Sequence, residues 1–323
     1  MTLAIIFNGQ GAQYKDMGLD FNQQRPVAKE VFDIAEEVTD YPIREWIESN
    51  PEMFNQTQFS QPAIAAVSLA IFNSLKEEYP QIAKAKYMAG LSLGEYSSLI
   101  ASGMLTLEDG FKLLKERGRL MTEHCQILEE EQPVQMAAVI AMPFDEIKQL
   151  VAEIHSEEMP LYIANLNSTT QIIIAGVKDS IKTFRKKAKE TGYKKVMPLK
   201  VEGPFHSPLM QAVCEPFKEI LANYTFTTGS TPIISNTTLE EQTTEKVRDL
   251  LVRHLVEPVR FQETIELFNN EGVTHLIQIG PGPTLANLLK REENVPKCLV
   301  IDKVEDLALV SEFLEDCQIN KEN

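Results

Sequence analysis

The amino-acid sequence predicts an α/β protein in which a small domain is inserted into a larger one. Short apolar runs of strand length alternate with helical patterns along most of the 323 residues, which is typical of an α/β fold. Between residues 133 and 200 the order becomes strand, helix, strand, strand, helix, strand, which is typical of a ferredoxin-like unit. We therefore expect a discontinuous large α/β domain at 1–130 and 200–323, interrupted by a ferredoxin-like small domain at 131–199.

The first part of the large domain begins with an apolar run at 3–7, which predicts a buried strand leading into a glycine-rich turn. A short strand is expected at 86–91, and it runs directly into Ser92. Thr106 precedes a helical pattern with acidic residues in its first turn, which indicates a capped helix start. The helices of this part are expected at about 26–39, 58–79 (with Pro62 near its first turn) and 106–127.

The same criteria predict the elements of the rest of the chain. In the small domain, strands are expected at 134–141, 161–166, 171–175 and 195–199, and helices at 144–156 and 180–191. Beyond residue 200, helices are expected near 208–222, 244–256 and 259–270, then a strand at 274–279, the turn Gly280-Pro281-Gly282 and a helix through 290. A strand at 297–301 and a helix to about 315 complete the predicted fold.

Composition and charge restrict the class of protein. Apolar residues make up 43% and charged residues 24% of the chain, so we expect a sizeable core. The net charge of −16 argues against nucleic acid or an anionic membrane as a partner. The apolar run at 3–7 is too short for a signal peptide, and no stretch approaches the roughly 18 apolar residues of a membrane span. We therefore expect a cytoplasmic protein.

The cysteines are sparse and widely spaced. They form no CxxC pair, which suggests neither a zinc site nor a disulfide framework. We therefore expect no metal and no cofactor. The four cysteines are Cys125, Cys214, Cys298 and Cys317.

The stretch Gly90-Leu91-Ser92-Leu93-Gly94 matches the pattern G-x-S-x-G of a nucleophile elbow. In such an elbow the serine occupies a strained turn between a strand and a helix, and the glycines avoid collisions with neighbouring backbone. The N–H of the next residue, here Leu93, points into the reaction site and can bind an oxyanion. The predicted strand before Ser92 and helix after it favour this interpretation. A plain strand-to-helix turn is the alternative.

A serine hydroxyl becomes a good nucleophile when a base accepts its proton, and histidine is the commonest such base. His206 lies in the rigid loop Gly203-Pro204-Phe205-His206-Ser207-Pro208, and catalytic groups are often found in loops between fixed elements. His254 is the second candidate. Of the other histidines, His124 and His155 are expected to be solvated on polar helices, and His275 to be a structural residue of a core strand.

Six short motifs are distributed along the chain: Gly9-Gln10-Gly11-Ala12-Gln13, Gly90-Leu91-Ser92-Leu93-Gly94-Glu95, Arg117-Gly118, Asn165-Leu166-Asn167-Ser168, Gly203-Pro204-Phe205-His206 and Gly280-Pro281-Gly282. In this order and spacing they resemble the malonyl-CoA:acyl carrier protein transacylase family of bacterial fatty-acid synthesis, over essentially the whole chain. The resemblance implies a hydrolase-like α/β core with a ferredoxin-like insertion. It also implies transfer of malonyl from malonyl-CoA to the phosphopantetheine thiol of acyl carrier protein, through a malonyl-serine intermediate.

The resemblance assigns Ser92 as the acylated nucleophile and His206 as its general base and acid. In the family the imidazole is oriented by a backbone carbonyl, here from the segment around His254. The chain departs from the family at two positions: Leu91 stands where a histidine is common, and His254 where glutamine is usual. A backbone carbonyl survives any substitution, so we expect the orientation of His206 to persist.

Further roles follow from the same resemblance. Gln10, with the N–H of Leu93, resembles the oxyanion hole. Arg117 resembles the arginine that binds the malonyl carboxylate, and Phe205 the bulky residue that favours malonyl over α-methylated extenders. Each has a plainer alternative: Gln10 in a turn, Arg117 on an exposed basic helix face, and Phe205 as a packing residue.

Residues 182–195 hold seven basic side chains and one acidic side chain, Glu190. In an acidic protein this concentration indicates a landing surface for an acidic partner such as acyl carrier protein, although a solvated helix face has the same pattern. The basic residues are Lys182, Arg185, Lys186, Lys187, Lys189, Lys194 and Lys195.

Three other functions use the same residues. One is a trans-acting malonyl transferase of a polyketide pathway. Another is an acyl-thioester serine hydrolase, although an arginine suited to a free carboxylate favours transfer of a dicarboxylic acyl unit. The third is a non-catalytic module that binds a carrier protein, and it would retain the serine, the histidine and the arginine only by accident.

Overall fold

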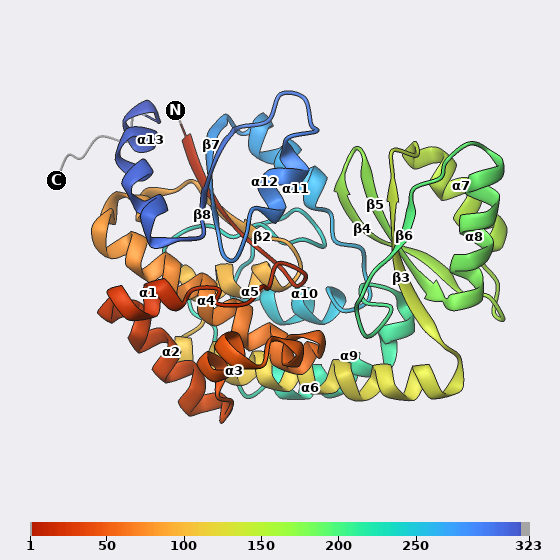
Figure 1. Cartoon of the computed structure of the whole chain (residues 1–323), viewed down its shortest axis with the longest axis horizontal. Helices are drawn as coiled ribbons and strands as arrows, with labels where there is room; N and C mark the ends of the chain where they lie inside the picture. Colours follow the sequence, from red (N-terminus) through yellow and green to blue (C-terminus); the bar gives the residue numbers. More distant parts are fainter. Residues whose placement is uncertain (1, 318–323) are drawn as a thin grey trace.

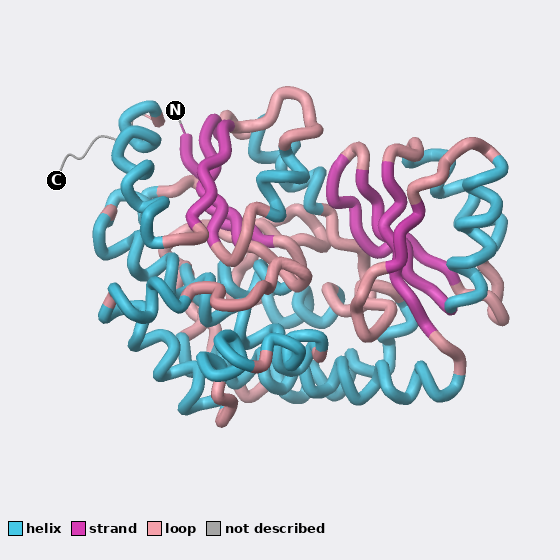
Figure 2. Tube along the Cα trace, viewed as in Figure 1, coloured by secondary structure: helices cyan, strands magenta, loops and turns pink. Residues whose placement is uncertain are grey.

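The computed structural model describes residues 2–317, which form helices around two four-stranded sheets (Figure 1). The strands lie in two groups, one among most of the helices and one to the side (Figure 2). Within residues 2–317, no helix has the length and apolar character needed to cross a membrane.

The first sheet is parallel, with the strand order β2-β1-β7-β8. Phe7, the last residue of β1, lies opposite the last residue of β2, Gly90, and the last residue of β7, Ile279. The segments that follow these three strands therefore leave the sheet at one edge, where ligands bind in open α/β sheets. The strands are β1 (Thr2–Phe7), β2 (Tyr87–Gly90), β7 (Val273–Ile279) and β8 (Lys297–Ile301).

Both faces of this sheet are covered by helices. Leu3, Ile5 and Phe7 of β1 belong to a core cluster with α4 (Thr57–Glu78), whereas Ala4 and Ile6 pack with residues of α11 (Phe261–Asn270) and α12 (Thr284–Leu289). A strand buried on both faces needs an uninterrupted apolar run, which residues 3–7 provide. α4 is itself buried on almost every side, consistent with its small and apolar residues.

The second sheet is antiparallel, with the order β4-β5-β3-β6 that a ferredoxin-like unit requires. Its strands are β3 (Val134–Ile140), β4 (Leu161–Ser168), β5 (Gln171–Val177) and β6 (Val196–Pro198). Ala137 and Ile174 pack under α7 (Phe144–Ile154) and α8 (Lys178–Glu190) on the outer face. Met136 and Ile173 belong instead to the main core cluster, so the inner face turns toward the large domain.

The remaining helices complete the fold. The α-helices are α1 (Leu19–Gln24), α2 (Pro26–Thr39), α3 (Ile43–Ser49), α5 (Leu93–Ala101), α6 (Leu107–Glu131), α9 (Gln211–Leu221), α10 (Val247–Arg253) and α13 (Val310–Asp316). Short 3₁₀ helices are η1 (Pro51–Asn55), η2 (Pro80–Lys84), η3 (Pro208–Met210) and η4 (Val304–Leu309).

The predicted fold class is confirmed, and the elements differ from the expected ones mainly at their ends. Thr106 caps α6 by accepting the N–H of Asp109, but the helix continues to Glu131. Pro62 is the sixth residue of α4, inside the helix and near its first turn as expected. The short helices α1 and α3 were not expected, and neither has a side-chain cap to mark its start. All strands of the second sheet lie within 131–199, and the division into domains at these bounds remains our proposal.

Candidate active site

Ser92 occupies a sharp turn between β2 and α5. Its backbone has φ 53° and ψ −106°, a strained conformation for a residue with a side chain. A Cβ atom added to Gly90 would lie 2.1 Å from the carbonyl carbon of Gly94, and one added to Gly94 would lie 2.2 Å from the carbonyl oxygen of Phe7. Only glycine therefore fits on either side of this turn.

His206 contacts Ser92 directly. Ser92 Oγ and His206 Nε2 are 2.7 Å apart, and His206 Nδ1 lies 2.7 Å from the carbonyl oxygen of His254. The carbonyl can only accept, so Nδ1 carries the proton and Nε2 is free to accept from the serine hydroxyl. Burial, followed by the positive charge of Arg117, lowers the pKa of His206 to about 3, against the opposing effect of the bond to His254. The imidazole is therefore neutral at neutral pH and available as a base.

The other histidines do not contact Ser92. His124 Nε2 is 2.8 Å from the carbonyl oxygen of Leu209, and His155 is exposed. His275 is buried, with Nε2 2.9 Å from Asp316 Oδ2. The side chain of His254 is fully buried, and neither ring nitrogen has a hydrogen-bond partner among the described residues. Burial, the neighbouring His206 and Arg117 hold the pKa of His254 well below its usual value.

Two groups near Ser92 can donate to an oxyanion. Gln10 lies in the turn after β1, and its Nε2 donates to Thr57 Oγ1 at 3.2 Å, which uses one of its two amide hydrogens. Leu93 is the first residue of α5, and a helix provides no internal acceptor for its first N–H. Both groups lie at the edge of the parallel sheet where Ser92 also lies.

Arg117 is buried in α6 and only 1% exposed, so it does not form an exposed basic face. Its guanidinium carbon lies 4.7 Å from the centre of the Tyr96 ring. Among the described residues, Nε and Nη2 have no hydrogen-bond partner. Burying a cation with free hydrogen-bond donors costs free energy unless an anion pairs with it. A guanidinium can donate two parallel hydrogen bonds to one carboxylate, so a carboxylate is a suitable partner.

A cavity of about 460 Å³ opens above Ser92, between the two sheets. Its wall includes Gln10, Ser92, Phe205 and His206, but the lining does not include Arg117. The inner face of the antiparallel sheet and α12 supply much of the remaining wall, including Met136, Ala138, Asn165, Asn167, Gln171, Ile173, Thr284 and Leu288. The structure thus brings together Ser92, His206, Gln10 and Phe205 at one cavity. Arg117 is buried outside the lining and packs against Tyr96, and its charge contributes to lowering the pKa of His206.

Two residues of this site had no expected role, although one of them, Glu95, ends one of the six motifs. Asn236 spans the elbow: its Oδ1 accepts the N–H of Ser92 at 2.8 Å, and its Nδ2 donates to the carbonyl of Gly90 at 2.6 Å. Glu95 is fully buried and accepts the N–H of Asn236 at 2.8 Å and a hydrogen bond from Gln242. Burial raises the pKa of Glu95 to about 7. Glu95 adjoins the elbow motif, but nothing near Asn236 in the sequence marks it.

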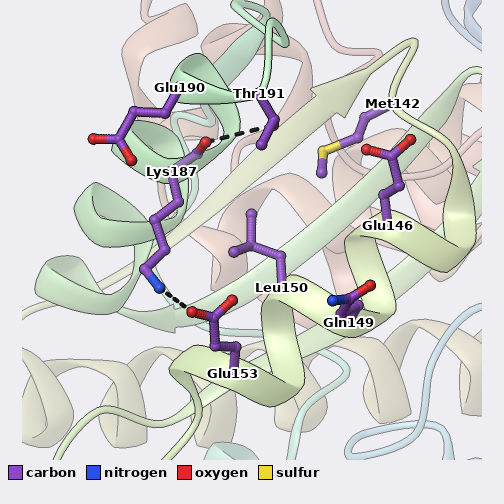
Figure 3. Close-up of a pocket in the computed structure, with 8 residues that line it drawn as sticks. All are labelled: Met142, Glu146, Gln149, Leu150, Glu153, Lys187, Glu190 and Thr191. Carbon is purple, nitrogen blue, oxygen red and sulfur yellow. Dashed lines mark hydrogen bonds and ion pairs between the residues drawn. The ribbon is translucent and has the colours of Figure 1, made fainter.

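Another hollow, of about 290 Å³, lies between α7 and α8 on the outer face of the antiparallel sheet (Figure 3). Lys187 and Glu153 form an ion pair across it. Its lining residues are Met142, Glu146, Gln149, Leu150, Glu153, Lys187, Glu190 and Thr191, which include no serine, cysteine or histidine. This hollow therefore lacks a pair like Ser92 and His206, which line the cavity on the opposite face of this sheet.

Comparisons with known proteins agree with this geometry. Residues 4–317 match the family model described as the acyl transferase domain. The chain is 34% identical over 316 residues to a malonyl CoA-acyl carrier protein transacylase of Bacillus subtilis, covering 97% of this chain and 98% of the relative. It is similar to the crystal structure of MCAT from Streptococcus pneumoniae, with 36% sequence identity and a TM-score of 0.87. The match covers 96% of this chain and 99% of that chain. It is also similar to the structure of a malonyl-transacylase in complex with its type II PKS acyl-carrier protein, with 30% sequence identity and a TM-score of 0.89. That match covers 97% of this chain and 99% of the other chain.

Proposed function

The chain belongs to the acyl transferase family, among the malonyl CoA-acyl carrier protein transacylases, and from this premise we propose that it moves malonyl from malonyl-CoA to the phosphopantetheine thiol of acyl carrier protein. The observation that carries the proposal is the 2.7 Å contact between Ser92 Oγ and His206 Nε2. The unpaired guanidinium of Arg117 adds the chemistry that a dicarboxylic acyl group needs.

The first half-reaction loads the enzyme. His206 Nε2 accepts the hydroxyl proton while Ser92 Oγ attacks the thioester carbonyl of malonyl-CoA. The N–H of Leu93 and the free amide hydrogen of Gln10 stabilise the oxyanion of the tetrahedral intermediate. The C–S bond then breaks, and His206 returns the proton to the departing thiolate of coenzyme A.

The second half-reaction runs in the opposite sense. His206 accepts the proton of the phosphopantetheine thiol, whose sulfur attacks the malonyl-serine ester. Collapse of the intermediate breaks the C–O bond and returns the proton to Ser92. Throughout, the His254 carbonyl holds the imidazole in the tautomer that both steps require, and it stabilises the imidazolium that forms in each.

The experiment that tests the proposal is intact mass spectrometry of the protein with malonyl-CoA, first alone and then with carrier protein. One malonyl group should appear on the enzyme and move to the carrier. An adduct that decays equally fast without carrier protein would favour the serine hydrolase. Similarity to a transacylase bound to a type II PKS acyl-carrier protein makes a polyketide carrier the second candidate acceptor. Relative rates with fatty-acid and polyketide carriers decide between the two.

Phe205 is proposed to select the acyl group. It precedes His206, lines the cavity and is largely buried, so its ring can occupy the space next to the substrate α-carbon. Replacing Phe205 with serine should raise the ratio of kcat/KM for methylmalonyl-CoA to that for malonyl-CoA by roughly 10- to 200-fold, the usual effect of one methyl group in a pocket. The measurement is the ratio in wild type and variant. An unchanged ratio would identify Phe205 as a packing residue.

Carrier protein is proposed to dock near residues 182–195. Lys182 and Lys187 already pair with Asp179 and Glu153, which leaves less of their charge for a partner. Lys194 and Lys195 are exposed and precede β6, after which the chain enters the cavity wall at Leu199 and Lys200. The end of the basic segment at 194–195 is therefore the part best placed for a carrier whose arm must reach Ser92.

Reversing both charges, Lys194→Glu and Lys195→Glu, should raise the KM for carrier protein several-fold at low salt while the KM for malonyl-CoA stays unchanged, because attraction between exposed charges is screened by salt. The control is the same double reversal at Lys29 and Lys76, in α2 and α4. Equal carrier KM values in the two double variants at low salt would identify Lys194 and Lys195 as ordinary solvated surface rather than a docking site.

A further inference from the structure

Thr57, the first residue of α4, joins two parts of the active site that are far apart in the sequence. Its hydroxyl oxygen accepts the hydrogen bond from Gln10 Nε2 at 3.2 Å. Its backbone N–H donates to Glu202 Oε2 at 2.5 Å, although Glu202 is 145 residues away. Thr57 itself is fully buried, whereas Gln10 and Glu202 are half-buried, so both bonds are partly shielded from bulk water.

Glu202 also binds α6. Thr122 Oγ1 donates to the same carboxylate oxygen at 3.0 Å, and it accepts the N–H of Gln58 at 3.3 Å. The first turn of α4 has no side-chain cap of its own, since Gln56 makes no capping bond. A carboxylate satisfies an unpaired N–H at a helix start and is favoured there by the helix dipole. Glu202 therefore supplies from a distant loop the cap that α4 lacks.

The backbone at this junction has no free space. A Cβ atom on Gly203 would lie 2.0 Å from Cys125 Sγ, so the loop after Glu202 lies directly against α6. A Cβ atom on Gly118, next to Arg117, would lie 2.7 Å from the Cα of Gln58, so α6 lies directly against the start of α4. The loop, α4 and α6 thus meet in direct contact around one carboxylate.

We propose that Glu202 is a positioning residue for acyl transfer, which holds the loop of Phe205 and His206 in register with Gln10 and α6. The inference rests on the proposed function. His206 has φ 57°, a conformation that persists in a residue with a side chain only where the surroundings enforce it. The carboxylate anchors this loop at the residue where it begins, through two hydrogen bonds to two different helices.

Replacing Glu202 with alanine removes both bonds and should lower kcat for malonyl transfer by roughly 10- to 100-fold, because small displacements of catalytic groups have effects of this size. The KM for malonyl-CoA should stay within about threefold of the wild-type value, since Glu202 does not line the cavity. Glu202→Gln keeps the reach and one acceptor oxygen and should restore most of kcat. Glu202→Asp keeps the charge but is one methylene shorter, and it should restore little.

The matched control is Glu129→Ala. Glu129 also accepts a backbone N–H, that of Val134 at 3.0 Å and only five residues along the chain, and it pairs with Lys178, but it is not among the residues that line the cavity. Steady-state kinetics and thermal unfolding are measured for all variants. A wild-type kcat in Glu202→Ala, or an equal loss in the two alanine variants, overturns the proposal. If Glu202→Ala does not fold, equal kcat values in the Gln and Asp variants overturn it. If the wild-type protein itself does not transfer malonyl, the proposed function is contradicted, rather than the role of Glu202.

Discussion

Replacing Ser92 with alanine should abolish the malonyl adduct and lower the rate of malonyl transfer by about 10⁴-fold or more, the range found when the nucleophile of a serine enzyme is removed. The reason is that the proposed reaction passes through an ester on Ser92 Oγ, which lies 2.7 Å from His206 Nε2, while the other nitrogen of that imidazole is held by the His254 carbonyl. The measurement is intact mass after incubation with malonyl-CoA, followed by peptide mapping.

A matched substitution is available in the same helix. Ser97 is fully buried in α5, and its Oγ has no hydrogen-bond partner among the described residues. Ser97→Ala therefore removes a buried serine hydroxyl close to the elbow without touching the proposed nucleophile, and it should retain the adduct. An adduct that persists in Ser92→Ala at the wild-type level would refute the assignment of Ser92.

Replacing Arg117 with alanine should lower kcat/KM for malonyl-CoA by roughly 30-fold to several thousand-fold. The malonyl carboxylate must leave water to reach Ser92, and losing one partner of a buried charge pair costs about 2–5 kcal/mol, with a tenfold change for each 1.4 kcal/mol. Acetyl-CoA has no such carboxylate, so its transfer should hold steady or improve. Arg117→Lys should be a poor substitute, because an ammonium cannot form the two parallel bonds of a guanidinium.

The control for this prediction is Arg119→Ala. Arg119 lies in the same helix but is half-exposed and pairs with Glu116 and Glu123, so its loss should leave transfer from both thioesters unaffected. The decisive quantity is the ratio of kcat/KM for malonyl-CoA to that for acetyl-CoA in each variant. If both thioesters lose activity by the same factor in Arg117→Ala, Arg117 is a structural residue and the malonyl specificity lacks its physical basis.

Local sequence was sufficient for most of the elements and for the elbow motif, because both depend on neighbours in the chain, but not for the uncapped short helices α1 and α3. The elbow needs glycine at positions 90 and 94 because any Cβ there meets backbone within 2.2 Å, and this steric demand is visible as a motif. The parallel strands β1, β2 and β7 appear as short apolar runs because they are buried on both faces. The start of α6 is marked because its cap, Thr106, lies within the same turn. The family resemblance then suggested roles for Gln10, Arg117 and Phe205, which the pattern of apolar and polar residues does not distinguish from their neighbours.

The tertiary structure decided which distant groups meet. The register of β1, β2 and β7 brings the turns of Gln10 and Ser92 to one edge, and packing of the two sheets places His206 Nε2 against Ser92. Asn236 and Glu202 act across 144 and 145 residues, through hydrogen bonds that leave no pattern in their own neighbourhoods. Likewise, Arg117 lies in a stretch typical of an exposed basic helix face, and only the tertiary structure shows that it packs against Tyr96 with Nε and Nη2 buried and without a hydrogen-bond partner among residues 2–317. Side-chain contacts between segments depend on three-dimensional distance, which the order of residues along the chain does not specify.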